Sequence, residues 1–393
     1  MYNELKSLLP KQNGKIEYTS FLEVFPSLEL LKTTPQDSYY HAEGDVWTHT
    51  KMVCDSLVGS SKYWSSSEDE QFIMFYSCLL HDISKPACTK HEEGRITSKG
   101  HSKRGAIDTR IDLWKKEIPF YLRESIVNII NCHQVPFFAF NQIQKGNHQI
   151  RTPEFLAHQL SWQMPLHLLI NVAKADMLGR TYVGKQQSMD DINLFEELCL
   201  EENCLYQPKK FFNEQTRMKY FSSNGSISPD YEFYTEPGSE VIVMCALPAS
   251  GKNTWIQKHG NNLPTISFDD TKAEYGLKEN DNVGKAVHDT IDRAKELLRK
   301  KEPFIWNSTN INPQMRKKTL DLLYSYGATV KIVYLESAEK EIKNRNTKRD
   351  TTLSNKKIDE MLFKWDVPTS IEAHSVSYEI NNTYKKNLKF NTQ

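Results

Sequence analysis

Hydrophobic positions recur with a helical period through the first half of the chain. Apolar side chains fall three and four positions apart at residues 71–81, 119–133 and 165–178, with few β-branched runs between them. From about residue 240 the pattern changes to short apolar runs that alternate with amphipathic stretches. The expected strands are residues 241–245, 265–268, 304–306, 329–335 and 375–380, and the expected helices between them are 254–260, 283–301, 313–326 and 338–346. This pattern predicts an all-α domain followed by an α/β domain with a parallel sheet.

A segment rich in turn-forming residues separates the two patterns. Residues 221–229 read Phe-Ser-Ser-Asn-Gly-Ser-Ile-Ser-Pro, and Pro237-Gly238 follows just before the first expected strand. We therefore predict a first domain at 1–225, a linker at 226–239 and a second domain at 240–393. A chain of 393 residues is long enough for two domains with separate cores.

Composition is that of a soluble protein, with 38% hydrophobic and 25% charged residues. No apolar run approaches the ~20 residues that span a bilayer, and the seven cysteines form no Cys-x-x-Cys pair. These features predict a cytoplasmic protein with free thiols and no membrane partner. Residues 1–237 carry 25 basic and 30 acidic side chains, whereas residues 238–393 carry 25 and 20. The basic second half suits a polyanionic ligand.

The first expected strand leads directly into a loop of small residues that ends at Gly251-Lys252. A strand, a tight loop and a helix start in this order predict a phosphate-binding P-loop, which would bind ATP or another NTP with Mg²⁺. The loop departs from the G-x-x-x-x-G-K-[ST] pattern at two positions, Ala246 and Asn253. The expected phosphate-binding residues are Ala246, Leu247, Pro248, Ala249, Ser250, Gly251, Lys252, Asn253 and Thr254.

Three further polar groups follow later strands or helices of this half. Asp269 comes after the second strand, where a carboxylate can accept the proton of an attacking hydroxyl. Residues 306–310 end the third strand without the aspartate expected of a motor ATPase. Arg345 and Arg349 are four positions apart, so they would share a helical face and could clamp a transferring phosphoryl group.

Taken in order, the segments 251–252, 269–272, 307–310 and 345–349 resemble the phage-type 5′-hydroxyl polynucleotide kinases. The resemblance covers about residues 240–370 and implies an α/β P-loop kinase with a helical lid. It implies these roles: Asp269 as general base, Lys252 on the β- and γ-phosphates, Arg345 and Arg349 in the lid, and Lys272, Thr309 and Asn310 on the substrate. In the family pattern, Lys272 and Phe268 replace an arginine and another basic residue, so we expect a different grip on the substrate.

His81-Asp82 ends the apolar helix expected at 71–81, and it belongs to a larger set of candidate metal ligands. That set is His49, His81, Asp82, His101, His133 and Asp176. Neutral imidazoles combined with carboxylates suit two divalent transition metals of the Mn, Fe, Co, Ni, Cu or Zn class. Each histidine taken alone is more often a core residue, and it is the full set that favours a metal centre.

The order His…His-Asp…His…His…Asp resembles the HD phosphohydrolase superfamily. The resemblance implies that Asp82 bridges two metals, which activate water for attack on phosphorus. It implies one shell completed by His49, His81 and Asp176, and a second completed by His101 and His133. Lys85, in the same His81–Pro86 segment, is a further catalytic candidate.

Residues 41–50 particularly resemble the HD module fused to some tRNA nucleotidyltransferases. This resemblance makes His41 a substrate-facing residue rather than a metal ligand.

The two halves together resemble the bacterial RNA end-healing enzymes that join an HD phosphohydrolase to a polynucleotide kinase. Such an enzyme would hydrolyse 2′,3′-cyclic phosphate or 3′-phosphate ends and phosphorylate 5′-hydroxyl ends of RNA. DNA ends are a second candidate substrate, and a separate RNA ligase would join the products. Two alternatives remain open: an HD nucleotidase fused to a nucleoside kinase, and a nucleotide-sensing switch whose P-loop transfers no phosphate.

Overall fold

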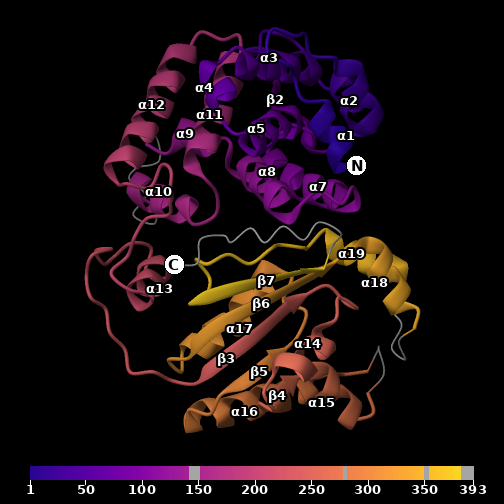
Figure 1. The fold of residues 1–393 in the computed structure, drawn as a ribbon, viewed down its shortest axis with the longest axis vertical. Helices are drawn as coiled ribbons and strands as arrows, with labels where there is room; N and C mark the ends of the chain where they lie inside the picture. Colours follow the sequence, from indigo (N-terminus) through magenta and orange to yellow (C-terminus); the bar gives the residue numbers. More distant parts are fainter. Residues whose placement is uncertain (141–150, 278–280, 349–353, 382–393) are drawn as a thin grey trace. The chain divides into compact units, whose positions relative to one another are not determined.

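The computed structural model describes residues 1–140, 151–277, 281–348 and 354–381. The chain forms two compact units, residues 1–210 and 211–393 (Figure 1). Within the described ranges, no helix combines the length and the apolar character that crossing a bilayer requires.

The first unit is almost entirely helical. Its elements are α1 (Tyr2–Ser7), α2 (Tyr18–Val24), the 3₁₀ helix η1 (Pro26–Thr33), α3 (Val46–Val58), α4 (Ser61–Ser65), α5 (Glu68–Leu80), α6 (Lys85–Cys88), β1 (Lys90–Glu92), β2 (Arg95–Thr97), α7 (His101–Lys115), α8 (Phe120–Cys132), α9 (Val135–Phe138), α10 (Pro153–Ser161), α11 (Leu166–Leu178) and α12 (Lys185–Glu201).

Helix α5 is the centre of this unit. It begins with a capping box in which Ser67 and Glu70 bond each other's backbone N–H groups. Every residue from Phe72 to Leu80 is buried, so the helix is apolar all round rather than on one face. It packs against α3, α8 and α11. A helix enclosed in this way carries the residues at its C-terminal end into the middle of the unit.

The small β1–β2 hairpin departs from the all-α expectation. Lys90 pairs with Thr97 and Glu92 with Arg95 in an antiparallel register. The two residues between the strands, Glu93 and Gly94, have positive φ angles of 50° and 75°. Two left-handed residues in succession make the tight turn whose twist matches that of a hairpin.

The second unit is an α/β fold. Its elements are α13 (Glu214–Ser222), β3 (Glu240–Ala246), α14 (Lys252–His259), β4 (Thr265–Ser267), α15 (Phe268–Glu274), α16 (Gly284–Lys300), β5 (Phe304–Asn307), α17 (Pro313–Tyr324), β6 (Thr329–Ser337), α18 (Glu339–Asn346), α19 (Asn355–Leu362) and β7 (Ser375–Asn381).

Five parallel strands form the sheet of this unit, in the order β4-β5-β3-β6-β7 (Figure 1). The two central strands β3 and β6 are nearly continuous apolar runs because both faces of the sheet are covered. Met244, Ala246, Ile305, Val333 and Leu335 form a buried cluster within the sheet. Since the strands are parallel, the loops that follow them gather at one edge, where ligands bind in folds of this class.

The structure divides the chain about fifteen residues earlier than the boundary expected from the sequence. Helix α13, which that expectation placed in the first domain, packs in the second unit. Its buried Arg217 donates hydrogen bonds to the backbone carbonyls of Ser370, Ala373 and His374, next to the start of β7. These bonds tie α13 to the sheet, and the turn-rich segment that follows α13 lies within the second unit.

Candidate functional site

The six candidate ligands of the first unit come from α5 and the helices around it. His81 and Asp82 follow α5 directly, His49 lies on α3, and Asp176 lies on α11. His101 is the first residue of α7, and His133 follows the last residue of α8. All six side chains are buried, the most exposed being His101 at 7%. Five helices therefore bring residues more than 120 positions apart into one buried cluster.

The donor atoms of the six residues form two adjoining groups. Within each group the donor atoms lie within 4.8 Å of one another: His49, His81 and Asp176 form one group, and Asp82, His101 and His133 form the other. The His49 Nε2 atom lies 3.1 Å from Asp176 Oδ1 and 3.8 Å from Asp82 Oδ2. Asp82 lies between the groups, because its Oδ2 is 3.1 Å from His81 Nε2 and its Oδ1 is 3.3 Å from His101 Nε2. This grouping matches the two shells that the HD resemblance implies.

Several buried polar atoms of the cluster are free to coordinate a metal. Among the described residues, three of these atoms have no hydrogen-bond partner: both carboxylate oxygens of Asp82 and the Nε2 atom of His133. Lys85 Nζ lies 2.7 Å from Asp82 Oδ2 as an ion pair, but without hydrogen-bond geometry. Buried polar atoms are rarely left unpaired, so these orphans fit a divalent ion. Imidazole and carboxylate donors suit a transition metal.

The environment keeps the carboxylates of Asp82 and Asp176 charged and the imidazoles of His101 and His133 neutral, whereas the neighbouring carboxylates outweigh burial and raise the pKa of His81. Burial alone would raise the pKa of Asp82, but the charges of His81 and Lys85 hold it well below its usual range. Burial lowers the pKa of His133 to about 3 and also lowers that of His101. Metal binding requires an ionised carboxylate and a neutral imidazole, which is the state that all these shifts except that of His81 favour.

The metal-facing nitrogen of three histidines is set by a backbone bond on the other nitrogen. The Nδ1 atoms of His81, His101 and His133 each lie 2.7–2.8 Å from the carbonyl oxygen three residues earlier. An Nδ1–H that donates to this carbonyl leaves the Nε2 lone pair to face the cluster. The ligands are thus oriented by the helix ends that carry them.

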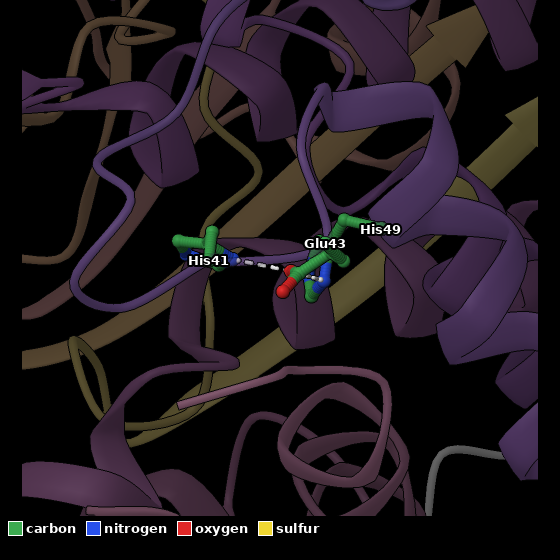
Figure 2. Close-up of side chains that lie close together, drawn as sticks. All are labelled: His41, Glu43 and His49. Atoms are coloured by element: carbon green, nitrogen blue, oxygen red, sulfur yellow. Dashed lines mark hydrogen bonds and ion pairs between the residues drawn. The ribbon is translucent and has the colours of Figure 1, made fainter. Parts of the chain in front are cut away.

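His49 is held differently, by Glu43 (Figure 2). The Glu43 Oε1 atom lies 3.0 Å from His49 Nδ1 and 2.8 Å from His41 Nδ1. Burial alone would raise the pKa of Glu43, but hydrogen bonds from the two histidines hold it well below its usual range. His41, the expected substrate-facing residue, therefore adjoins a candidate metal ligand. It belongs to neither of the two groups above, but its donor atom forms a third close group with those of Glu43 and His49.

Glu43 and Arg180 were not among the residues expected from the sequence. Arg180 donates to both oxygens of Asp176, at 3.0 and 2.7 Å. Its spacing of four residues from Asp176, that of an i,i+4 ion pair at a helix end, is the one sequence signal that could have found it. Glu43 lies in the loop before α3, and its partner His49 lies on that helix, so only the fold reveals the role of Glu43.

In the second unit, the P-loop joins β3 to α14 as expected. Gly251, with a φ of 103°, is the N-cap of α14, and Lys252 is that helix's first residue. Ala249 also adopts the left-handed region, with a φ of 61°. A non-glycine residue held there costs about 1–3 kcal/mol, and such strain clusters at ligand-binding loops. The Oγ atom of Ser250 is buried and has no hydrogen-bond partner among the described residues.

Asn253 meets Asn307 at the end of the neighbouring strand β5. Asn307 Nδ2 donates to Asn253 Oδ1 over 3.1 Å. The Oδ1 atom of Asn307 has no hydrogen-bond partner within the described ranges. An amide oxygen is an acceptable ligand for Mg²⁺ or its waters, so the pair fits the metal of a bound NTP.

Thr309 and Asn310 support the P-loop from the adjacent loop. The Thr309 carbonyl accepts a hydrogen bond from Ala246 N–H at 2.8 Å. Asn310 is 5% exposed, and its Nδ2 donates to the Met244 carbonyl at 3.0 Å. The described contacts of Asn310 lie within the fold, so it holds the loop in place. Whether either residue also contacts a substrate stays a prediction.

Arg345 lies beside the P-loop, as the lid hypothesis requires. Its guanidinium donates to the Ser250 carbonyl at 3.4 Å and to Ser337 Oγ at 3.1 Å, and it pairs with Glu341 at 3.3 Å. Arg349, the second expected lid residue, lies outside the described residues.

Asp269 and Asp270 lie in the first turn of α15, a helix that the sequence pattern did not predict. Ser267 caps this helix by accepting from the Asp270 N–H, so neither aspartate is the cap. Both carboxylates are exposed, and Lys272 follows one turn later, half-buried. Because β4 and β3 are parallel, α15 begins at the same edge of the sheet as the P-loop.

A comparison with protein families places a similarity in the second unit. A family model described as an AAA domain matches residues 241–368, about a third of the chain. A curated relative is the bifunctional polynucleotide phosphatase/kinase of Schizosaccharomyces pombe, 23% identical over 166 residues that make up 41% of this chain. The match spans 38% of that relative's length. Together with the P-loop geometry, these findings support a kinase-like, nucleotide-binding function for this part of the chain.

Proposed function

We propose that this chain is an enzyme that heals nucleic-acid ends, with a 5′-hydroxyl kinase in the second unit and a metal-dependent phosphoesterase in the first. The observation that carries the proposal is the pairing of a P-loop and exposed Asp269 in one unit with a buried two-group His/Asp centre in the other. Both chemistries act on phosphate at a nucleic-acid end. RNA is the favoured substrate, and DNA is the alternative.

In the kinase reaction, Asp269 accepts the proton of the 5′-hydroxyl. The 5′ oxygen forms a bond to the γ-phosphorus of the NTP, and the bond from that phosphorus to the β–γ bridging oxygen breaks, which releases NDP. Lys252 and Arg345 neutralise the charge of the transferring phosphoryl group. Two observations support these roles: Lys252 begins α14 behind the P-loop, and Arg345 contacts the P-loop backbone.

In the phosphoesterase, residues of the first unit form the metal-binding centre. His49, His81 and Asp176 would hold one divalent metal, and His101 and His133 the other, with Asp82 shared between them. When bound, such metals supply Lewis-acid activation of water and of the phosphate. Lys85, held between Asp82 and Gln36, adds positive charge beside the shared carboxylate. His41 lies next to this centre and would face the substrate.

The experiment that tests the kinase proposal compares acceptors for γ-³²P-labelled ATP. We expect label on an RNA oligonucleotide with a 5′-hydroxyl and none on the same oligonucleotide with a 5′-phosphate. Transfer to free nucleosides in preference to oligonucleotides would indicate a nucleoside kinase instead. ATP binding without transfer to either acceptor would indicate a nucleotide-sensing switch.

A further inference from the structure

Glu43 differs in kind from the groups that hold the other metal-facing histidines. His81, His101 and His133 each direct Nδ1 to a neutral backbone carbonyl. Of the four candidate ligand histidines, only His49 has its Nδ1 against a carboxylate among the described residues, 3.0 Å from Glu43 Oε1. The Gly179 carbonyl, at 3.4 Å, is a second neighbour of this nitrogen and has hydrogen-bond geometry, but Glu43 is closer. A carboxylate on the outer nitrogen of a ligand histidine fixes its tautomer and strengthens it as a donor to metal.

Glu43 is held rigidly for this role. Its side chain is 2% exposed, and its second oxygen, Oε2, accepts the Thr181 N–H at 2.9 Å. The Thr181 carbonyl in turn accepts from the Ala42 N–H at 3.0 Å, so the two loops are bonded to each other in both directions. Such anchoring fixes the position of the carboxylate before any ligand binds.

The loop that anchors Glu43 continues from the helix that supplies another ligand of the same metal group. Arg180, next to Thr181, binds both oxygens of Asp176. Asp176 Oδ1 lies 3.1 Å from the inner nitrogen of His49. A closed chain of contacts therefore runs from Glu43 through His49 to Asp176, then through Arg180 and Thr181 back to Glu43.

His41 shares the same oxygen of Glu43 (Figure 2). The two imidazole rings stand edge to face with centroids 4.8 Å apart. Glu43 Oε1 accepts a hydrogen bond from His41 Nδ1 at 2.8 Å and lies 3.0 Å from His49 Nδ1, so one carboxylate oxygen contacts both rings. This arrangement links a metal ligand to a residue at the border of the centre.

We propose that Glu43 is the positioning residue of the N-terminal metal centre: it orients His49 as a ligand of the metal group with His81 and Asp176, and it aligns His41 beside that group. The inference rests on the proposed phosphoesterase and adds to it a residue that controls one of its two metal groups. Because Glu43 acts through His49, its loss changes metal binding as well as catalysis.

The test measures Co²⁺ binding to the full-length chain by calorimetry and by the visible absorption of the bound ion. The Glu43→Gln variant keeps the shape of the side chain and removes its charge. We expect it to weaken one of two Co²⁺ sites by about 10–100-fold and to alter the absorption spectrum, as loss of a group behind a ligand does. Glu43→Asp should recover part of the lost affinity. Kinase activity should stay at the level of the unchanged protein.

The matched control is Glu202→Gln. Glu202 also pairs with a histidine of this unit, His158, at 2.9 Å, but away from the candidate ligands. We expect the control to bind Co²⁺ like the unchanged protein. His41→Ala should keep its affinity for Co²⁺, because His41 belongs to neither of the two groups that would hold the metals. Equal loss of Co²⁺ in His41→Ala would overturn the assignment of the effect to His49.

Asp82→Ala separates failure of this inference from failure of the proposed function. If Asp82→Ala loses Co²⁺ while Glu43→Gln binds two ions with unchanged affinity and spectrum, Glu43 has no positioning role although the metal centre stands. If Asp82→Ala also binds Co²⁺ normally, the centre itself is refuted. If Glu43→Gln unfolds the first unit, seen as lost helical circular dichroism, Glu43 is a structural residue and the inference fails.

Discussion

Two adjacent aspartates give the sharpest comparison at the scale of single residues. Asp269 and Asp270 are both exposed in the first turn of α15. We expect Asp269→Ala to lower the kinase rate by a factor of about 100 or more, because it removes the general base. Asp270→Ala should change the rate little, although it removes the same charge from the same turn. Single-turnover phosphorylation of a 5′-hydroxyl oligonucleotide measures both rates. A larger loss of rate in Asp270→Ala than in Asp269→Ala would identify Asp270 as the base.

The sequence predicted most of the chemistry-bearing residues that the structure brings together, but few of the residues that position them. The six candidate histidine and aspartate ligands stood out because of their residue types and because His81-Asp82 follows an apolar helix. Glu43 did not, since one carboxylate in a loop has no pattern of its own. Its partners, at positions 49 and 181, become neighbours only when the helices pack.

At the scale of elements, the apolar runs located all five strands of the sheet to within two residues. For the central strands β3 and β6 they succeeded because strands covered on both faces are nearly continuous apolar segments. The short helix α15 was missed because its seven residues are mostly polar and begin directly after β4. The β1–β2 hairpin was missed because it is short and exposed, so no alternation of apolar and polar residues marks it.

Helix α13 shows why the domain boundary could not be read from turn-forming residues. The Ser/Gly/Pro-rich stretch after α13 indicates a loop, but a loop can lie inside a unit as well as between units. What assigns α13 is Arg217, whose bonds reach residues about 155 positions later.

We therefore expect Arg217→Ala in the full-length chain to destabilise the second unit. Loss of the guanidinium leaves the carbonyls of Ala373 and His374 without their donor, which costs about 1–3 kcal/mol in the free energy of unfolding. Arg293→Ala, which removes an exposed arginine of α16, is the control and should cost little. The effect is measured by urea unfolding, with the loss of ATP binding as the readout. Destabilisation of the Co²⁺ centre instead would assign α13 to the first unit.

At the scale of the whole molecule, each unit contains its own set of candidate residues. All six candidate metal ligands, with Glu43 and Lys85, lie within residues 1–210, and the P-loop, Asp269 and Arg345 lie within residues 211–393. The basic excess of the second half accords with a polyanionic substrate there. Separate sets predict two activities that can be removed one at a time.

One measurement tests this central claim most directly. An RNA oligonucleotide with a 5′-hydroxyl and a 2′,3′-cyclic phosphate is incubated with ATP, Mg²⁺ and Co²⁺, and the mass of both ends is followed by mass spectrometry. The unchanged protein should add a phosphate at the 5′ end and hydrolyse the 3′ end. Asp82→Ala should add the 5′ phosphate alone, and Lys252→Ala should process the 3′ end alone. Loss of both changes in either variant, with the protein still folded, would contradict the account of two separate sites in one chain.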